Sequence, residues 1–143
     1  MAASKKPRKK YVPKPQRQIP IMFRHNSESE RTLQLLPHVE YMKLKNGIAD
    51  EESWNTLACR LNIGQKLAHN DKYGEDVRNT TDAAITAIKC IYDRFKNVGK
   101  FGATGDELLQ IGDALNLTDE LQKASTRREL LNATEYVFKH AAV

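Results

Sequence analysis

A dense group of basic residues near the start of the chain is the strongest chemical signal in the sequence. Residues 1 to 24 contain eight Lys and Arg residues and no Asp or Glu. Such a cluster binds phosphate backbones by neutralising charge and releasing counterions, and an aromatic ring within it can stack on an exposed base. The nucleic-acid-binding residues that this pattern predicts are Lys5, Lys6, Arg8, Lys9, Lys10, Tyr11, Lys14 and Arg17.

The same charges leave other partners open. The segment could be a solubilising tail, or it could bind an acidic protein surface instead of DNA or RNA. A membrane partner is disfavoured, because a polybasic segment needs an acyl chain or an apolar anchor for stable attachment. Ala2 also stands where N-myristoylation requires glycine. We therefore expect a nucleic acid or a nucleoprotein complex as the partner, and no membrane.

A glycine-rich stretch at residues 99–105 has a spacing that invites comparison with a phosphate-binding loop. It lacks the terminal Gly-Lys-Ser/Thr of that loop, and Asp106 and Glu107 would place two negative charges where the phosphate should lie. The glycines therefore predict a helix end, a turn and a new helix start.

The residue types that bind metals or transfer protons are scattered along the chain. The four histidines, His25, His38, His69 and His140, show no metal-ligand spacing. The acidic residues after His69 do not follow the order of a calcium loop, and the consecutive acids at positions 50–52 are typical of a helix start. We therefore expect no catalytic residue, no metal and no cofactor, and the protein is predicted to be nonenzymatic.

Two cysteines and three aromatic residues are predicted to serve packing. Cys59 and Cys90 have no CxxC partner, so they predict buried thiols rather than a disulfide or a zinc site. Trp54, Tyr92 and Phe95 each fall within an apolar helical stripe, where aromatic rings are more often core than a ligand cage.

The charge distribution divides the 143-residue chain into an arm and a domain. From His25 onward there are 15 basic and 18 acidic residues, a formal charge of −3, so the net charge of +5 comes from the first residues. Four prolines in the basic segment oppose helix formation. We predict a basic, Pro-rich arm over residues 1–25, disordered when unbound, and a helical domain over residues 26–143.

Capping signals and apolar spacing predict the first half of this domain. A capping box at Ser27–Glu30 opens helical structure that reaches Asn46-Gly47, either as two short helices or as one helix bent at Pro37. Asp50 is a good N-cap for a helix through about His69, and residues 70–74 read as a loop.

The second half of the domain is predicted to be helical as well. One helix should run from about Thr81 to Asn97. Capping boxes at residues 104–107 and 126–129 open two more, the first interrupted at residues 116–118. No stretch alternates as a strand does. We predict an all-α bundle of four main helices with one or two short helices.

Four short motifs follow one another in the chain. They are Lys9-Lys10-Tyr11-Val12-Pro13-Lys14-Pro15, Leu44-Lys45-Asn46-Gly47, Leu61-Asn62-Ile63-Gly64 and Thr104-Gly105-Asp106-Glu107. With them the chain resembles small uncharacterised helical proteins encoded by phages and prophages of Gram-negative bacteria. The resemblance implies an accessory role in the cytoplasm of a bacterial host cell during infection, and it supplies no catalytic residues.

Two functions remain open on the sequence alone. The first is a nonenzymatic accessory protein whose helical body presents the basic arm to nucleic acid or nucleoprotein. The second is a protein-binding inhibitor or adaptor that acts on a host complex, such as a defence system, while the arm contacts nucleic acid or an acidic surface of that complex. A small helical fold can serve either function.

Overall fold

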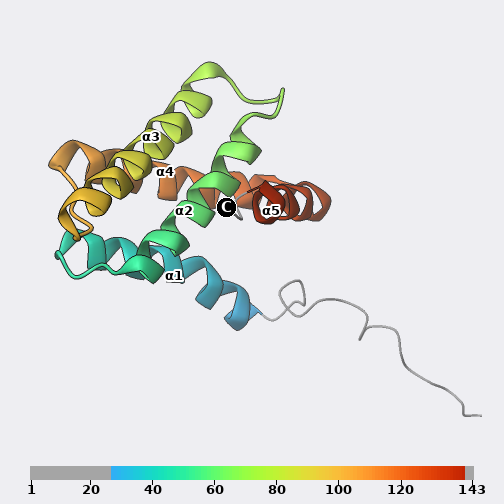
Figure 1. Ribbon diagram of the computed structural model, residues 1–143. Coiled ribbons are helices and arrows are strands. Elements are labelled where there is room, and N and C mark those ends of the chain that lie inside the picture. Colours follow the sequence, from blue (N-terminus) through green and yellow to red (C-terminus); the bar gives the residue numbers. More distant parts are fainter. Residues whose placement is uncertain (1–26, 141–143) are drawn as a thin grey trace, which may run out of the picture. The chain divides into compact units, whose positions relative to one another are not determined.

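The computed structural model describes the backbone of residues 27–140 and the side chains of residues 34–140 (Figure 1). The chain divides into two units, residues 1–33 and 34–143. Five helices make up the described range: α1 (Ser27–Lys45), α2 (Glu51–Ala68), α3 (Glu75–Val98), α4 (Gly105–Ala124) and α5 (Arg127–His140). No strand occurs between residues 27 and 140, and the predicted all-α class is confirmed.

Helix α1 continues through Pro37, so residues 27–45 form one helix rather than two short ones. It ends where the sequence predicts, at Asn46 and Gly47. Gly47 has φ 78°, a left-handed conformation that glycine adopts without steric cost, and the Ile48 N–H donates to the Lys43 carbonyl at 2.9 Å. The predicted Ser27–Glu30 capping box depends on side chains that lie outside the described ones.

Helix α2 begins at the predicted cap. The Asp50 side chain accepts a hydrogen bond from the Ser53 N–H at 2.9 Å, and the Asp50 N–H donates to Ser53 Oγ at 3.3 Å. This reciprocal pair satisfies two backbone donors that a helix start leaves without partners. The hydrogen bonds from Ser53 also hold the pKa of Asp50 below its ordinary value.

Helix α3 begins at Glu75, six residues before the predicted start, so that boundary was wrong. Glu75 and Asp76 occupy its first turn, where carboxylates interact favourably with the positive end of the helix dipole. The hydroxyls of Thr80 and Thr81 donate to carbonyls of the same helix. These contacts satisfy the polar side chains of the first turns. The same residues show no apolar periodicity, so the sequence did not predict a helix there.

Helix α4 is continuous, and the interruption predicted at residues 116–118 was also wrong. Thr118 is completely buried, and its hydroxyl donates to the Ala114 carbonyl one turn earlier at 2.7 Å. Its side chain packs against Gly64 of α2, where an added Cβ would overlap Thr118 Oγ1. The missing side chain of Gly64 therefore allows α2 and α4 to approach each other, and Thr118 serves packing rather than capping.

Helix α5 follows the third predicted capping box. The Glu129 N–H donates to Thr126 Oγ1 at 3.1 Å, and the Thr126 N–H donates to Glu129 Oε1 at 2.8 Å. Ala133 and Val137 are buried on the predicted apolar face. The helix packs mainly against α2.

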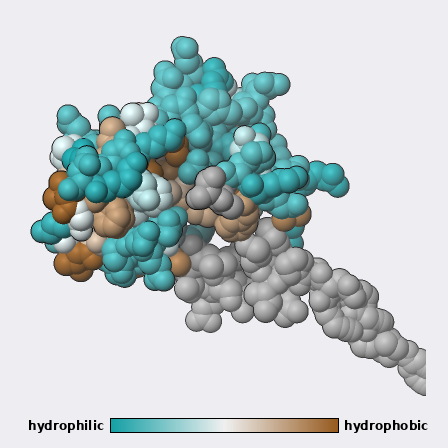
Figure 2. Space-filling view, in the orientation of Figure 1, coloured by the Kyte–Doolittle hydropathy of each residue, from teal (hydrophilic) through white to brown (hydrophobic). Residues whose placement is uncertain are grey.

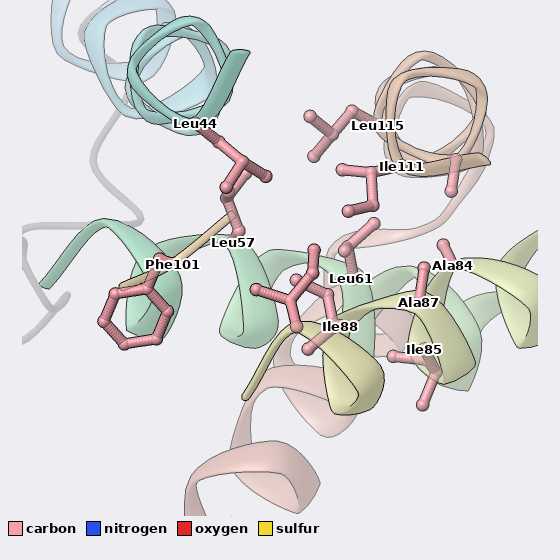
Figure 3. Packing of buried hydrophobic residues seen from close by; sticks show 12 residues of the cluster. Leu44, Leu57, Leu61, Ala84, Ile85, Ala87, Ile88, Phe101, Ile111 and Leu115 are labelled. Carbon is pink, nitrogen blue, oxygen red and sulfur yellow. The ribbon is translucent and has the colours of Figure 1, made fainter. Parts of the chain in front are cut away.

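The core consists of two hydrophobic clusters that share α2. The main cluster joins α2, α3 and α4 with Leu44 of α1; its buried residues are Leu44, Leu57, Leu61, Ala84, Ile85, Ala87, Ile88, Ile91, Phe101, Ile111, Ala114 and Leu115. Figure 3 shows Leu61 of α2 between Ile111 of α4 and Ile88 of α3. The second cluster joins α2, α4 and α5 through Ile63, Leu67, Ala68, Leu121, Ala133 and Val137.

The aromatic residues predicted for the core lie beside the main cluster, half-buried. The Trp54 and Tyr92 ring centroids are 4.8 Å apart. Phe95 stacks on Phe101, with centroids 3.9 Å apart and planes 7° from parallel. Trp54 also donates its indole N–H to the Ile88 carbonyl at 3.1 Å. These rings are packed against one another, and the prediction that they serve the core is confirmed.

Candidate nucleic-acid interface

The predicted nucleic-acid-binding residues lie outside the part of the chain that the structure describes. These residues are Lys5, Lys6, Arg8, Lys9, Lys10, Tyr11, Lys14 and Arg17. Their assignment stays a prediction from composition. The described helices carry three further surfaces with distinct chemistry, and each is a candidate for a role in binding.

The first surface is an open pocket between α2 and α5, with a volume of about 410 Å³. Its lining residues are Asn62, Gln65, Lys66, His69, Tyr136, Val137 and His140. None of them is acidic, in a body whose sequence carries more acids than bases. The pocket therefore concentrates cationic and neutral hydrogen-bonding groups, and its size is within the usual range for small-ligand sites.

Three stacked side chains form one wall of this pocket. The Tyr136 and His140 rings have centroids 4.1 Å apart and planes 26° from parallel. The Lys66 ammonium lies 4.2 Å from the centroid of the Tyr136 ring, where the negative face of the ring attracts a cation. Among the described residues no carboxylate pairs with Lys66, so the positive charge at this wall is not neutralised by an acid.

A hydrogen-bonded group holds His69 in the pocket. His69 Nε2 lies 2.9 Å from Asp82 Oδ1 of α3, and Gln65 Nε2 donates to the same oxygen at 2.9 Å. Burial raises the pKa of Asp82, but the hydrogen bonds from Gln65 and His69 outweigh this effect, and the net pKa is lowered. Asp82 is therefore a charged acceptor that orients two lining side chains without lining the pocket itself.

The hydrogen bonds fix one ring nitrogen of each pocket histidine. A carboxylate and a carbonyl can only accept, so His69 Nε2 donates to Asp82 and His140 Nδ1 donates to the Tyr136 carbonyl at 2.9 Å. The other nitrogen of each ring has no partner among the described residues. In a neutral ring that second nitrogen carries no hydrogen and only accepts, so the Lys66 ammonium is the cationic donor that remains in this lining for an anionic oxygen.

Sequence reasoning missed this pocket, because it tested the histidines only for metal-ligand spacing. A usable signal was present: Lys66 and His69 are three residues apart, and Tyr136 and His140 are four apart, so each pair lies on one helix face. What the sequence could not supply is the packing of α5 against α2. Among the described residues no group of three His, Cys, Asp or Glu could hold a metal ion.

The second surface is an exposed apolar stripe on α1. Leu35, Leu36, Val39 and Met42 recur along one side of the helix, and each is about half exposed. The opposite side is anchored: Leu44 enters the main cluster, and the Tyr41 hydroxyl donates to the Leu108 carbonyl at 2.8 Å. Such a stripe is typical of a helix that contacts another molecule or segment. Figure 2 shows that, over the face in view, hydrophobic residues form small groups among hydrophilic ones.

The third surface is an ion cluster that joins α1, α2 and α4. Asp119 accepts from Arg60 at 2.8 Å, and His38 Nε2 lies 2.8 Å from its other oxygen. The Arg60 side chain is only 12% exposed, and its buried Nε has no hydrogen-bond partner in the described part of the chain. The Arg60 charge already has a carboxylate partner, so this cluster acts as a cross-link between helices.

The remaining candidate groups have structural roles. Gly99 ends α3 with φ 82°, and the Thr104–Glu107 box starts α4. This confirms that the glycine-rich stretch is a helix end and a restart. Arg94 forms an ion pair with Glu107 across that turn. Burial raises the pKa of Glu107, but the Arg94 and Thr104 hydrogen bonds outweigh it and lower the pKa overall.

The prediction of two buried thiols was half wrong. Cys59 is half-buried beside the second cluster, whereas Cys90 is exposed on α3, and both are unbridged. Burial raises the pKa of the Cys59 thiol, although the nearby Arg60 charge acts in the opposite sense. Cys90 widens the apolar stripe in sequence, but in the structure its side chain is exposed on α3.

Comparison with known proteins adds no family to these observations. No protein-family model, curated protein or solved structure matches the chain. Within the described range, none of the helices is both long and apolar enough to cross a membrane.

Proposed function

We propose that this protein is a nonenzymatic accessory protein that binds nucleic acid, or a nucleoprotein complex, through its basic N-terminal arm. The observation that carries the proposal is the charge distribution: eight cations and no acid in residues 1 to 24, ahead of a remainder with a formal charge of −3. In this proposal the helical body presents the arm. The net negative charge of the body disfavours phosphate binding over most of its own surface. The phage or prophage context implied by the sequence resemblance fits such a role.

The proposal makes binding depend on the arm and on salt. Counterion release makes log affinity fall linearly with log salt, with a slope set by the number of phosphates neutralised. We expect deletion of residues 1–18 to weaken oligonucleotide binding by roughly 100-fold at low salt, and to leave the helical circular-dichroism signal intact. Fluorescence anisotropy with single-stranded DNA, double-stranded DNA and RNA would compare the three substrates.

A charge-matched pair of variants separates the arm from net charge. One variant carries Glu at Lys6, Arg8, Lys9 and Lys10. Its control carries Glu at four exposed lysines of the body: Lys89, Lys96, Lys100 and Lys123. Both variants lose the same formal charge, so only local binding by the arm predicts that the first loses affinity far more than the second. Equal losses in both variants would contradict the proposal.

A second function is favoured by one observation, the exposed apolar stripe of α1. In this alternative the protein is an inhibitor or adaptor, and the stripe binds a host protein while the arm contacts that protein's nucleic acid or acidic surface. Apolar contacts survive salt that screens exposed charges. A pull-down from host cells at high salt after nuclease treatment, with wild type and with Leu36→Glu and Val39→Glu, would test it. A partner retained by wild type and lost by both variants supports this alternative.

A further inference from the structure

We infer that the pocket between α2 and α5 is a binding site for the phosphate group of a nucleotide, either as a mononucleotide or within a nucleic-acid strand. The pocket joins Lys66 and His69 of α2 to Tyr136 and His140 of α5. Its assignment to a nucleic-acid strand rests on the proposed function, and it gives the helical body a contact of its own beyond the arm.

The charge of the lining selects an anion. Lys66 supplies a positive charge with no carboxylate partner among the described residues; Lys45, Lys89, Lys100 and Lys139 also pair with no acid there, but only Lys66 lines the pocket. The Tyr136 ring holds the ammonium by its face, which leaves the N–H groups of Lys66 available for hydrogen bonds. An anionic oxygen beside Lys66 would receive charge-assisted hydrogen bonds, the stronger class of such bonds.

The side chains around Lys66 are held in place by hydrogen bonds, and each lining amide keeps a second N–H that can donate to a phosphate oxygen. Asp82 fixes the orientation of His69, and the Tyr136 carbonyl fixes that of His140. The lining amides Asn62 and Gln65 each donate to a protein oxygen already, Asn62 to the Ala58 carbonyl at 2.7 Å and Gln65 to Asp82 at 2.9 Å. Orientation before binding lowers the entropic cost of forming the complex.

The size of the pocket and its aromatic wall indicate a ligand larger than a bare anion. At about 410 Å³, the pocket can hold a nucleotide unit as well as its phosphate. The His140 ring, which stacks on Tyr136, provides an aromatic surface near the cation, and bases interact favourably with such surfaces. A phosphate with an attached base therefore matches the lining better than inorganic phosphate does.

The test follows the four histidine side chains by NMR in the full chain. Inorganic phosphate, adenosine 5′-monophosphate and a ten-residue oligonucleotide are titrated separately, with His38 as the internal reference. We expect adenosine monophosphate to shift the His69 and His140 signals saturably and to bind more tightly than phosphate. Shifts with the oligonucleotide but not with the mononucleotide would assign the site to a strand; no shift at His69 and His140 with any probe would overturn the inference.

Matched variants show whether the pocket itself binds. Lys66→Gln removes the charge on an exposed helix position, and we expect it to weaken mononucleotide binding at least fivefold. Lys66→Arg should retain most of the affinity. Lys89→Gln, at an exposed lysine of α3, is the control and should change nothing. If Lys66→Gln binds as wild type does, the inference fails.

Deletion of residues 1–18 separates this inference from the proposed function. The truncated protein should keep its mononucleotide affinity within about twofold, even though its oligonucleotide affinity falls with the lost counterion release. If truncation leaves oligonucleotide binding unchanged, the proposed role of the arm fails while the pocket stands. If truncation abolishes the mononucleotide shifts at His69 and His140, the pocket fails while the arm stands.

Discussion

The main cluster and the second cluster differ in how closely their helices pack against one another. In the main cluster, three long helices pack pairwise against one another, and Leu57, Leu61, Ile91, Ile111 and Leu115 are less than 2% exposed. In the second cluster, α5 packs mainly against α2, and no residue of α5 is as deeply buried. The pocket lies beside this less enclosed cluster. The difference indicates that the main cluster supplies most of the stability, while α5 forms the adjustable wall of the candidate site.

The largest effect on stability should come from shortening one buried side chain in each cluster. We expect Leu61→Ala to lower the free energy of unfolding by about 3 kcal/mol, because it leaves a cavity among three helices. Val137→Ala should cost about 1.5 kcal/mol, for two lost methyl groups at a site that can partly collapse. Urea denaturation followed by circular dichroism measures both. Equal costs would contradict the difference in enclosure between the two clusters.

The contact between Gly64 and Thr118 offers the next largest effect. Gly64→Ala would press a methyl group into the buried Thr118 side chain, and overpacking of this kind costs about 2 kcal/mol. Thr118→Ala removes the hydroxyl that this methyl meets, so the double variant should lose at least 1 kcal/mol less than the sum of the single variants. Gly105→Ala is the control, since a Cβ there meets no atom within 4 Å. Additive losses would show that α2 and α4 do not touch at this point.

The same contact shows what sequence reasoning could and could not reach. Caps were predictable, because Asp50, Thr104 and Thr126 satisfy backbone donors a few residues away and need no tertiary partner. Thr118 resembles a cap in sequence, but its burial against α2 gives it a packing role that local spacing does not reveal. The pocket could not be predicted for the same reason: its two walls are about seventy residues apart in the chain, and only tertiary packing brings them together. The basic arm needed only composition, and it remains untested.

A smaller effect on stability is expected from substitutions in the capping boxes of α4 and α5. Glu107→Gln keeps the box geometry, since glutamine can also accept from the cap residue, but it removes the charge paired with Arg94. Arg94 is 42% exposed, so we expect a loss of about 1 kcal/mol or less at pH 7. Glu129→Gln acts at an exposed ion pair with Lys72 and should cost less still. Thermal denaturation of both variants would measure the ranking, and a larger loss at Glu129 would contradict it.

The pH dependence of the Glu107 contribution has a defined sign. Its pKa is lowered in the folded protein from an ordinary value of 4.5. The folded state therefore gains stability from ionised Glu107 above that ordinary value, and this gain disappears as the pH falls through the lower, folded pKa. The difference in stability between wild type and Glu107→Gln should be full at pH 7 and should shrink below pH 4.5. A difference that grows on acidification would contradict the ion pair.

The smallest expected effect is kinetic and leaves stability unchanged. Cys90 is exposed, whereas Cys59 is half-buried beside the second cluster with its thiol pKa raised by burial. A thiol reacts as its thiolate. The lower exposure of Cys59 and its smaller thiolate fraction therefore both slow its labelling. In Ellman labelling at pH 7.5 we expect two phases, the faster lost in Cys90→Ser and the slower lost in Cys59→Ser. If α5 opens locally, Val137→Ala will speed the slow phase and leave the fast phase unchanged. Equal acceleration of both phases would mean that the second cluster opens only when the whole domain unfolds.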